Sequence, residues 1–449
     1  MFRKILIANR GEIALRVIRA CREMGIRSVI AHSEADRDSL PVRMADERIC
    51  IGPGPSGKSY LNIPNIVSAA FISNAEAIHP GYGFLSENTS FAEICNDVKL
   101  TFIGPSASVM SIMGDKVSAR QAMKEAGLPM LPGTPVVRTL PEAREAAREI
   151  GFPLMLKAVA GGGGRGIRLI QQPEEFDRIF TIAQNEVREA FRDDGIYFER
   201  YLARARHIEI QVLVDQYGHG VHLGERNCSC QRRNQKVLEE SPSPHLSPEL
   251  RQEIGMKAIR AVQQVGYRNA GTLEFLLDEQ DRYYFMEMNT RLQVEHPVTE
   301  LVTSVDLVKE QIRIAAGLPL QLRQEDIQFR GHAIECRITA EDASADFRPQ
   351  TGVVEHYLPP GGPGVRVDSH LFSGYEVPPH YDSLLSKLVV WAETRNEAIA
   401  RMQRALGEYE IEGITTTIPF HQRLLNHEGF IRGETYTRFL QEEAEALKI

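Results

Sequence analysis

The most informative stretch of the chain is Glu287-Met288-Asn289-Thr290-Arg291-Leu292-Gln293-Val294-Glu295. Its odd-numbered positions are all strongly polar, whereas most of its even-numbered positions are apolar. Alternate side chains of an extended chain share one face, so the pattern predicts a strand whose polar face spans about 27 Å. That face would carry carboxylate, amide, guanidinium, amide and carboxylate groups. Strands that merely face solvent favour Thr, Lys and Ser, and this one is therefore expected to bind a ligand.

A second carboxylate lies upstream, within the apolar run Gly271-Thr272-Leu273-Glu274-Phe275-Leu276-Leu277. A tight turn near Gln280-Asp281 would set Glu274 opposite Glu287, to within a residue or two. Two unpaired carboxylates repel each other in that arrangement, and a hard cation such as Mg²⁺, bridging to substrate phosphates, resolves the conflict. The alternative is an ordinary hairpin with its charges in water, which the apolar neighbours of Glu274 disfavour.

A glycine run, Gly161-Gly162-Gly163-Gly164-Arg165-Gly166, separates two strand-like segments, Leu154–Ala158 and Ile167–Ile170. Four glycines carry a large entropic cost that a simple turn rarely needs, but they let backbone N–H groups approach a polyphosphate closely. Lys157 would add a positive charge beside them. The run predicts a hairpin that closes over phosphates; a merely flexible hairpin is the alternative.

A second glycine-rich stretch, Gly52-Pro53-Gly54-Pro55-Ser56-Gly57-Lys58-Ser59, matches the Walker A pattern. Such a loop holds phosphate with free backbone N–H groups at the start of a helix. Pro53 and Pro55 remove two of those donors, and Pro64 falls in the helix that should follow. We therefore interpret this stretch as a proline-rich surface loop.

Composition limits the broad class of protein. A chain of 449 residues with 43% hydrophobic and 25% charged residues indicates two to four globular domains. The net charge of −8 offers no overall basic field for nucleic acid. Cys228 and Cys230 form a lone pair without the second pair that a zinc site requires, and all six cysteines are expected to be free thiols. No apolar stretch is long enough to cross a membrane, and we expect a cytoplasmic protein.

The periodicity of the first hundred residues indicates βαβ alternation and hence a parallel sheet. The pattern runs through Lys4–Ala8, the helix Gly11–Met24, Arg27–His32, Val67–Phe71, Ala75–His79 and Thr101–Ile103. Beyond a helix from Lys116 to about Ala126, the chain mixes strands and helices through to a helix from Arg395 to about Gly407. The fold class is thus α/β and α+β: a doubly wound N-terminal domain, a central α+β body with a small mobile lid, and a C-terminal α+β domain.

Several long motifs occur in one order along the chain. They are Ile7-Ala8-Asn9-Arg10-Gly11-Glu12-Ile13-Ala14, His79-Pro80-Gly81-Tyr82-Gly83-Phe84-Leu85-Ser86-Glu87-Asn88, Met113-Gly114-Asp115-Lys116, the glycine run, Gln231-Arg232-Arg233, Gln235-Lys236-Val237, Glu287 through Pro297, and Glu335-Cys336-Arg337-Ile338. Over its whole length the chain resembles the biotin carboxylase subunit of biotin-dependent carboxylases of the acetyl-CoA carboxylase type, a branch of the ATP-grasp superfamily. The resemblance implies a homodimer with a biotin carboxylase N-terminal domain at 1–113, an ATP-grasp domain at 114–327 whose lid covers about 131–203, and a biotin carboxylase C-terminal domain at 328–449.

The resemblance also implies the reaction. Bicarbonate and ATP, with Mg²⁺ or Mn²⁺, would form carboxyphosphate, and the N1′ atom of protein-linked biotin would then be carboxylated. No Met-Lys-Met biotinylation sequence occurs in the chain, so biotin is expected on a separate biotin carboxyl carrier protein, with carboxyltransferase subunits as further partners. The final acceptor is expected to be acetyl-CoA, with propionyl-CoA and pyruvate as alternatives.

Site residues follow from the resemblance position by position. For ATP they are Lys116, Lys157, Gly163, Gly164 and His207 at the phosphates and lid, Glu199, Arg200, Tyr201 and Leu202 at the adenine hinge, and Gln231, Asn234, Leu276, Glu274 and Glu287. Glu274, Glu287 and Asn289 would hold the metal; Lys236, Arg291, Gln293 and the backbone of Val294 would hold bicarbonate. Glu295 would deprotonate bicarbonate, and Arg337 would stabilise the biotin enolate.

The chain departs from the family pattern at three places: Asn234 replaces a common His, Arg200 replaces a common Lys, and Ala158-Val159-Ala160 shortens the glycine run. We expect these changes to shift nucleotide affinity and to leave activity intact. Two other classes remain open: an ATP-grasp ligase without a biotin step, and a catalytically silent nucleotide-binding subunit. Arg337 and the stretch Gln293–His296 favour a biotin carboxylase over the first, and the intact acidic residues and Lys236 disfavour the second.

Overall fold

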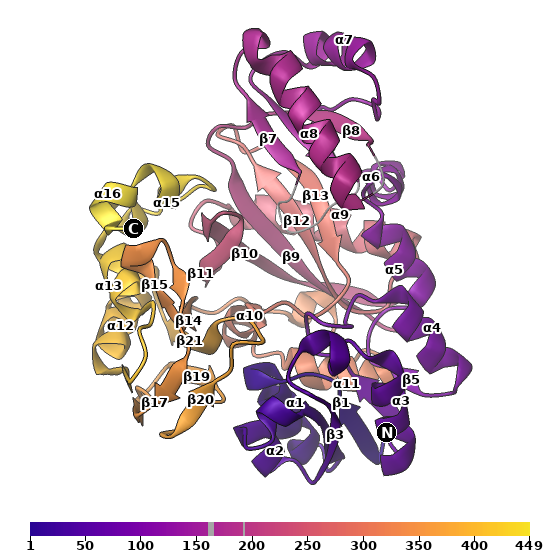
Figure 1. Cartoon of the computed structure of the whole chain (residues 1–449), viewed down its shortest axis with the longest axis vertical. Helices are drawn as coiled ribbons and strands as arrows, with labels where there is room; N and C mark the ends of the chain where they lie inside the picture. The colour runs from indigo at the N-terminus through magenta and orange to yellow at the C-terminus, as the bar shows by residue number, and fades with distance from the viewer. Residues whose placement is uncertain (160–165, 192–193) are drawn as a thin grey trace.

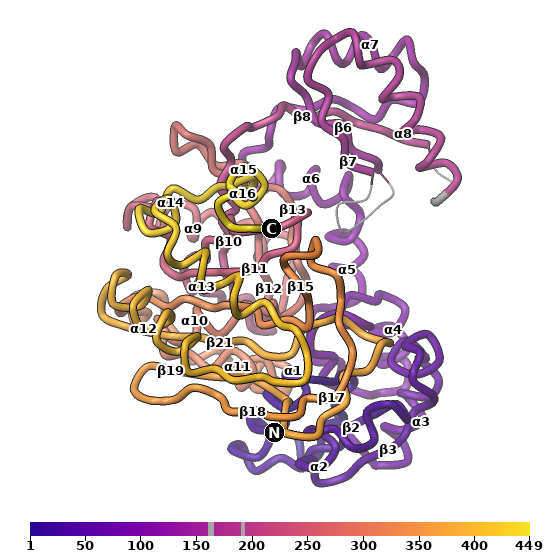
Figure 2. Tube along the Cα trace, turned by 60° about the vertical axis from the view of Figure 1, so that its left-hand side comes forward, coloured from indigo at the N-terminus to yellow at the C-terminus, as the bar shows by residue number. Residues whose placement is uncertain are grey.

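The computed structural model describes residues 1–159, 166–191 and 194–449, and it shows an N-terminal domain, a long central sheet and a projecting lid (Figure 1). The lid lies at one end of the molecule, and the N-terminal domain lies at the other. The last part of the chain packs along the side of the sheet between them (Figure 2). Most of the predicted glycine loop, including Gly163 and Gly164, falls outside the described residues.

The N-terminal domain contains the predicted parallel sheet, with strand order β3-β2-β1-β4-β5. Successive residues of β1 point to opposite faces: Ile5 and Ile7 pack in the core that contains helix α1, whereas Leu6 packs with α3 and α4. The sheet is therefore doubly wound, as predicted. Its elements are β1 (Lys4–Ile7), α1 (Gly11–Glu23), β2 (Arg27–Ser33), α2 (Leu40–Met44), β3 (Glu47–Gly52), α3 (Ile63–Ser73), β4 (Ala77–His79), α4 (Thr89–Asp97), β5 (Thr101–Phe102) and α5 (Ala107–Gly114). The apolar segment Val67–Phe71 lies inside α3.

The central and C-terminal regions share one antiparallel sheet with strand order β13-β12-β9-β10-β11-β14-β21-β19. The pairing of β11 with β14 joins regions that the sequence predicts as separate domains. The strands are β9 (Arg206–Val214), β10 (Gly220–Arg232), β11 (Gln235–Ser241), β12 (Asn269–Leu277), β13 (Tyr283–Asn289), β14 (His332–Thr339), β19 (Val365–Ser369) and β21 (Leu384–Ala392). The helices around them are α6 (Lys116–Glu125), α9 (Pro248–Gln264), α10 (His296–Thr303), α11 (Leu307–Ala315), α12 (Arg395–Glu408) and α13 (Ile418–Asn426).

The lid is a three-stranded sheet of order β7-β6-β8 covered by two helices. It has its own apolar core, which includes Leu156, Phe180 and Phe198. As predicted, β6 and β7 form an antiparallel hairpin on either side of the glycine run. The elements are α7 (Leu140–Ile150), β6 (Leu154–Ala158), β7 (Ile167–Ile170), α8 (Phe176–Phe191) and β8 (Ile196–Arg200).

Short elements complete the C-terminal region. They are β15 (Glu341–Asp342), β16 (Arg348–Pro349), β17 (Gly352–Val354), β18 (His356–Leu358), β20 (Tyr375–Val377), β22 (Glu410–Glu412), α14 (Glu428–Ile431), α15 (Phe439–Glu442) and α16 (Ala444–Leu447). None of the helices in the described part of the chain has both the length and the apolar character that a membrane span needs.

One prediction about local structure is wrong: the strand expected over residues 287–295 ends at Asn289. The backbone N–H of Thr290 donates to the carboxylate of Glu87 in the N-terminal domain (3.0 Å), which takes the chain out of the sheet. The residues that follow form a loop and a turn, and Pro297 lies in the first turn of α10, where it needs no N–H partner. The alternating polar residues therefore surround the site instead of lining one flat strand.

Candidate active site

A cavity of about 690 Å³ lies between the central sheet, the lid and the C-terminal region. All but one of the predicted site residues that the structure describes line it. They are Lys116, Lys157, Glu199, Arg200, Tyr201, Leu202, His207, Gln231, Asn234, Lys236, Glu274, Leu276, Glu287, Asn289, Arg291, Gln293, Val294 and Arg337. The exception is Glu295, which is fully buried directly behind Lys236.

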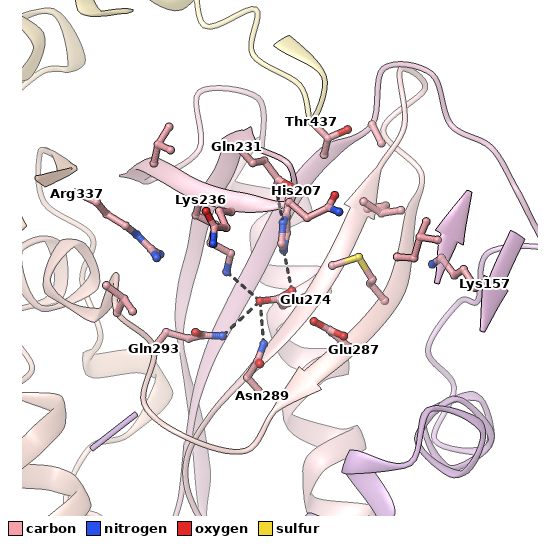
Figure 3. Close-up of a pocket in the computed structure, with 18 of the residues that line it drawn as sticks. Lys157, His207, Gln231, Lys236, Glu274, Glu287, Asn289, Gln293, Arg337 and Thr437 are labelled. Carbon is pink, nitrogen blue, oxygen red and sulfur yellow. Dashed lines mark hydrogen bonds and ion pairs between the residues drawn. The ribbon is translucent and has the colours of Figure 1, made fainter. Parts of the chain in front are cut away.

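Glu274 lies at the centre of this set (Figure 3). Its carboxylate accepts hydrogen bonds from Lys236 Nζ (2.9 Å) and Asn289 Nδ2 (2.8 Å), and lies 3.0 Å from His207 Nε2. Burial alone would raise the pKa of Glu274, but Lys236 and His207 hold it well below its usual value. Glu274 is therefore ionised and already paired.

Glu287 faces Glu274 directly across the β12–β13 hairpin, as predicted. In the described part of the chain, no hydrogen bond or ion pair reaches its carboxylate. Enclosure by the surrounding protein and the charge of Glu274 raise its pKa, although its side chain is open to the cavity. The Glu287 carboxylate is therefore available to bind a cation from the cavity. With Glu274 and the amide oxygen of Asn289 it forms the oxygen-rich donor set that suits Mg²⁺.

A second donor set fits a metal less well. His207, Glu209 and Glu274 each offer a ligand atom within 4.8 Å of one another. However, Glu209 is already paired with Lys236 (2.6 Å) and with Arg226. Because the carboxylate of Glu287 has no partner among the residues that the structure describes, it marks the side of Glu274 on which a cation would bind.

Glu295 is held between two cations. Its Oε1 accepts from Lys236 Nζ (2.6 Å), and its Oε2 accepts from an Arg337 guanidinium nitrogen (2.9 Å). Burial opposes ionisation, but Lys236 and Arg337 hold the pKa of Glu295 well below its usual value. Arg337 also donates through Nε to Glu239 (2.6 Å). An ionised carboxylate beside two anion-binding side chains can accept a proton from an acidic substrate held by them.

The loop after β13 supplies the remaining polar groups. Arg291 donates to Glu87 Oε2 (2.8 Å) and to Gln293 Oε1 (2.8 Å). Gln293 in turn donates to Glu274 (3.3 Å). These bonds fix a guanidinium and an amide at the edge of the cavity beside Lys236, where a small planar anion could accept from all three.

The lid contributes Lys157 and Glu199, on neighbouring strands β6 and β8. Lys157 Nζ lies 2.5 Å from a carboxylate oxygen of Glu199, which also pairs with Arg120. Figure 3 shows Lys157 set apart from the group around Glu274. Leu202 and Leu276 also line the cavity and add apolar surface to its wall. Asn234 lies at positive φ in the turn between β10 and β11 and lines the cavity.

Sequence reasoning missed several residues of the site. Arg226 is fully buried and pairs with Glu209. The signal for Glu209 was present in β9, where His207, Glu209 and Gln211 alternate with apolar residues. Glu87 lies within the motif His79–Asn88, which does not indicate its hydrogen-bond partner. No pattern in the sequence connects Glu239 with Arg337.

The class of protein is an ATP-grasp enzyme, which activates a substrate with ATP. Three features define it: the antiparallel sheet, the lid built on a glycine-rich hairpin, and two opposed carboxylates that together suit a cation. Three family models match the chain: biotin carboxylase, N-terminal domain (residues 1–110); carbamoyl-phosphate synthase L chain, ATP binding domain (residues 115–323); and biotin carboxylase C-terminal domain (residues 335–442). The chain belongs to the biotin carboxylase family and is therefore an ATP-dependent ligase.

Individual proteins agree with this assignment. A biotin carboxylase from Nostoc is 57% identical over 98% of this chain and 99% of its own length. One of the pyruvate carboxylase subunits of Methanothermobacter thermautotrophicus is 53% identical over 98% of this chain and 90% of its own. The biotin carboxylase domain dimer of Hydrogenobacter thermophilus 2-oxoglutarate carboxylase, solved with MgADP, ADP and bicarbonate, is 50% identical with a TM-score of 0.96, over 100% of this chain and 99% of its own.

Proposed function

We propose that the chain carboxylates biotin carried on a separate carrier protein, using ATP and bicarbonate and passing through carboxyphosphate. The observation that carries this proposal is the arrangement of Lys236, Glu295 and Arg337. A fully buried, ionised carboxylate lies between two cations that open onto one cavity. The Hydrogenobacter relative was solved with bicarbonate and adenine nucleotide together, which supports the same substrates here.

Bicarbonate would bind between Lys236, Arg291, Gln293 and the N–H of Val294. Glu295 would take its proton, and the oxygen anion formed would attack the γ-phosphorus of ATP while ADP leaves. Lys236 and Arg291 would hold the anion in place, since phosphoryl transfer depends chiefly on positioning and charge neutralisation. Carboxyphosphate would then break its C–O bond to give CO2 and phosphate, and that phosphate would take the N1′ proton of biotin. Arg337 would hold the biotin enolate so formed while its N1′ attacks CO2.

The nucleotide would bind under the lid. Lys116, Lys157, His207 and the glycine loop with Gly163 and Gly164 would contact phosphates. The segment Glu199–Leu202, with Gln231, Asn234 and Leu276, would contact the adenosine. Glu274, Glu287 and Asn289 would hold Mg²⁺ or Mn²⁺, which when bound neutralises phosphate charge.

We propose the same domain limits as the sequence suggests, 1–113, 114–327 and 328–449, and a homodimer with carrier and carboxyltransferase partners. Acetyl-CoA is proposed as the final acceptor, with propionyl-CoA as an alternative. The identity with a pyruvate carboxylase subunit makes pyruvate the other alternative. Affinity purification of the chain from its own cells, followed by identification of the co-purifying transferase, distinguishes these acceptors.

The activity is tested with a coupled assay of ADP release. We expect ATP hydrolysis that requires bicarbonate and that rises when free biotin is added. Bicarbonate-dependent hydrolysis that does not respond to biotin would favour an ATP-grasp ligase without a biotin step. Nucleotide binding without hydrolysis would favour a catalytically silent subunit.

A further inference from the structure

Two buried side chains contact backbone carbonyl oxygens of the turn from Gln293 to Glu295. Neither of them is among the residues that line the cavity. They are His296, the first residue of α10, and Lys387, on strand β21 of the C-terminal region; both have no solvent exposure. His296 contacts the carbonyl oxygen of Gln293, and Lys387 contacts that of Val294. The N–H of Val294, proposed to donate to bicarbonate, lies between these two carbonyl groups along the backbone.

His296 holds the first of the two peptide groups. Its Nδ1 lies 2.9 Å from the carbonyl oxygen of Gln293. Since that oxygen can only accept, Nδ1 carries the proton. In a trans peptide the C=O and the following N–H point in opposite directions. Fixing the Gln293 carbonyl therefore aims the N–H of Val294 away from His296, and within the described residues no protein acceptor takes that N–H.

Lys387 holds the second peptide group. Its Nζ donates to the carbonyl oxygen of Val294 (2.9 Å) and lies 3.1 Å from Glu12 Oε2. Glu12 belongs to helix α1, and its other oxygen accepts a hydrogen bond from the hydroxyl of Tyr82, which lines the cavity. One buried ammonium group thus ties the turn of the central region to the N-terminal and C-terminal regions.

We propose that His296 and Lys387 are positioning residues that orient the peptide groups on either side of Val294. They would thereby aim the N–H of Val294 at bicarbonate and fix the backbone of Glu295. This inference rests on the proposed bicarbonate site and assigns no contact with substrate to either side chain. Because neither side chain lines the cavity, their loss should weaken the use of bicarbonate and leave ATP binding in place.

The test compares two variants at one position. His296→Leu removes the side-chain donor and leaves only the backbone N–H of residue 296, which also donates to the Gln293 carbonyl oxygen (3.4 Å). His296→Asn instead places an amide N–H close to where Nδ1 lies. The loss of one hydrogen bond to a group that must stay ordered corresponds to about a tenfold change. We expect His296→Leu to raise the KM for bicarbonate about tenfold with the KM for ATP nearly unchanged. His296→Asn should recover most of that loss.

Lys387 is tested in a charge-matched pair, Lys387→Met with Glu12→Gln, because a lone Glu12 would be a buried unpaired charge. Arg251→Met with Glu225→Gln serves as the matched control: Glu225 is fully buried and pairs with Arg251, and neither residue lines the cavity. The double variant should raise the KM for bicarbonate about tenfold, and the control should leave it unchanged.

The outcomes distinguish a failure of the proposed function from a failure of the positioning role. A wild-type chain without bicarbonate-dependent ADP release defeats the proposed function itself. If the wild type is active, equal KM values for His296→Leu and His296→Asn overturn the positioning role, as do parallel changes in the KM for ATP. Should His296→Leu fail to fold, His296→Asn decides alone, since a large rise in its KM for bicarbonate also overturns the inference.

Discussion

Glu274 and Glu287 lie directly opposite each other on β12 and β13, yet only Glu274 has protein partners among the described residues. Lys236 forms an ion pair with Glu274, and His207 Nε2 lies 3.0 Å from the Glu274 carboxylate. The charge of Glu287 faces the cavity. In the proposed metal site, one carboxylate would therefore both stabilise the fold and contact the metal, whereas the other would be available for the metal alone.

Glu287→Gln should therefore weaken metal use without weakening the fold. The Mg²⁺ concentration that gives half-maximal ADP release should rise at least about tenfold, and the urea midpoint should stay unchanged. Glu274→Gln should affect both, because Lys236 would lose one of its three buried carboxylate partners; we expect a loss of about 1–3 kcal/mol in unfolding free energy. Equal losses of stability in the two variants would contradict this division of roles.

Glu295→Gln should abolish the base and leave the nucleotide site intact. We expect bicarbonate-dependent ADP release to fall by about 10²–10⁴-fold, the usual contribution of a general base, with the Kd for ATP changed only a few-fold. Glu300→Gln is the matched control, since Glu300 is a buried carboxylate on α10 that pairs with Arg16 and Arg366. It should retain turnover. A parallel collapse of ATP binding in Glu295→Gln would show a structural role for that residue.

Two neighbouring carboxylates should shape the pH dependence of stability in opposite directions. Burial raises the pKa of Glu239 from 4.5 to about 7, against the effect of Arg337. The folded chain then keeps a proton that the unfolded chain releases. The contribution of Glu239 to the free energy of unfolding is fully present below pH 4.5 and is lost as the pH rises through 7.

Glu240 behaves in the opposite way. Burial would raise its pKa, but Arg395 and His332 lower it from 4.5 to about 2. Its stabilising contribution is present above pH 4.5 and is lost as the pH falls towards 2. The urea midpoint is measured between pH 2 and pH 8. In the wild type it should fall towards neutral pH because of Glu239 and towards acid pH because of Glu240. Glu239→Gln should remove the first fall, and Glu240→Gln should remove the second. Identical profiles for the two variants would refute these assignments.

The Walker-like loop should tolerate one glycine substitution and not another. A Cβ on Gly52, whose φ is +139°, would overlap the backbone carbonyl oxygen of Lys58, whereas a Cβ on Gly57 would meet nothing within 4 Å. Gly52→Ala should destabilise the chain by about 1–3 kcal/mol, and Gly57→Ala should be neutral. Neither should change the KM for ATP, since no residue from Gly52 to Ser59 lines the cavity. A rise in that KM for both variants would show that the loop binds phosphate.

Local features of the site could be predicted because they depend on few residues. The hairpin that opposes Glu274 and Glu287 needs only a short turn and two alternating strands, and the structure has the predicted register. The βαβ pattern of the N-terminal domain likewise follows from hydrophobic periodicity. The end of β13 at Asn289 could not be predicted, since it depends on Glu87, about two hundred residues away in sequence.

The family, the order of the elements and the residue types that the chemistry needs can all be read from the sequence, because these are properties of local pattern and motif. Which charges meet depends on the folded arrangement. The pairing of β11 with β14 places Glu239 beside Arg337, and the packing of three regions buries Lys387 against Glu12 and Val294. Such contacts arise from the register and packing of segments far apart in the chain. They determine which carboxylate lies between two cations, which faces the cavity without a partner among the described residues, and which has a raised pKa.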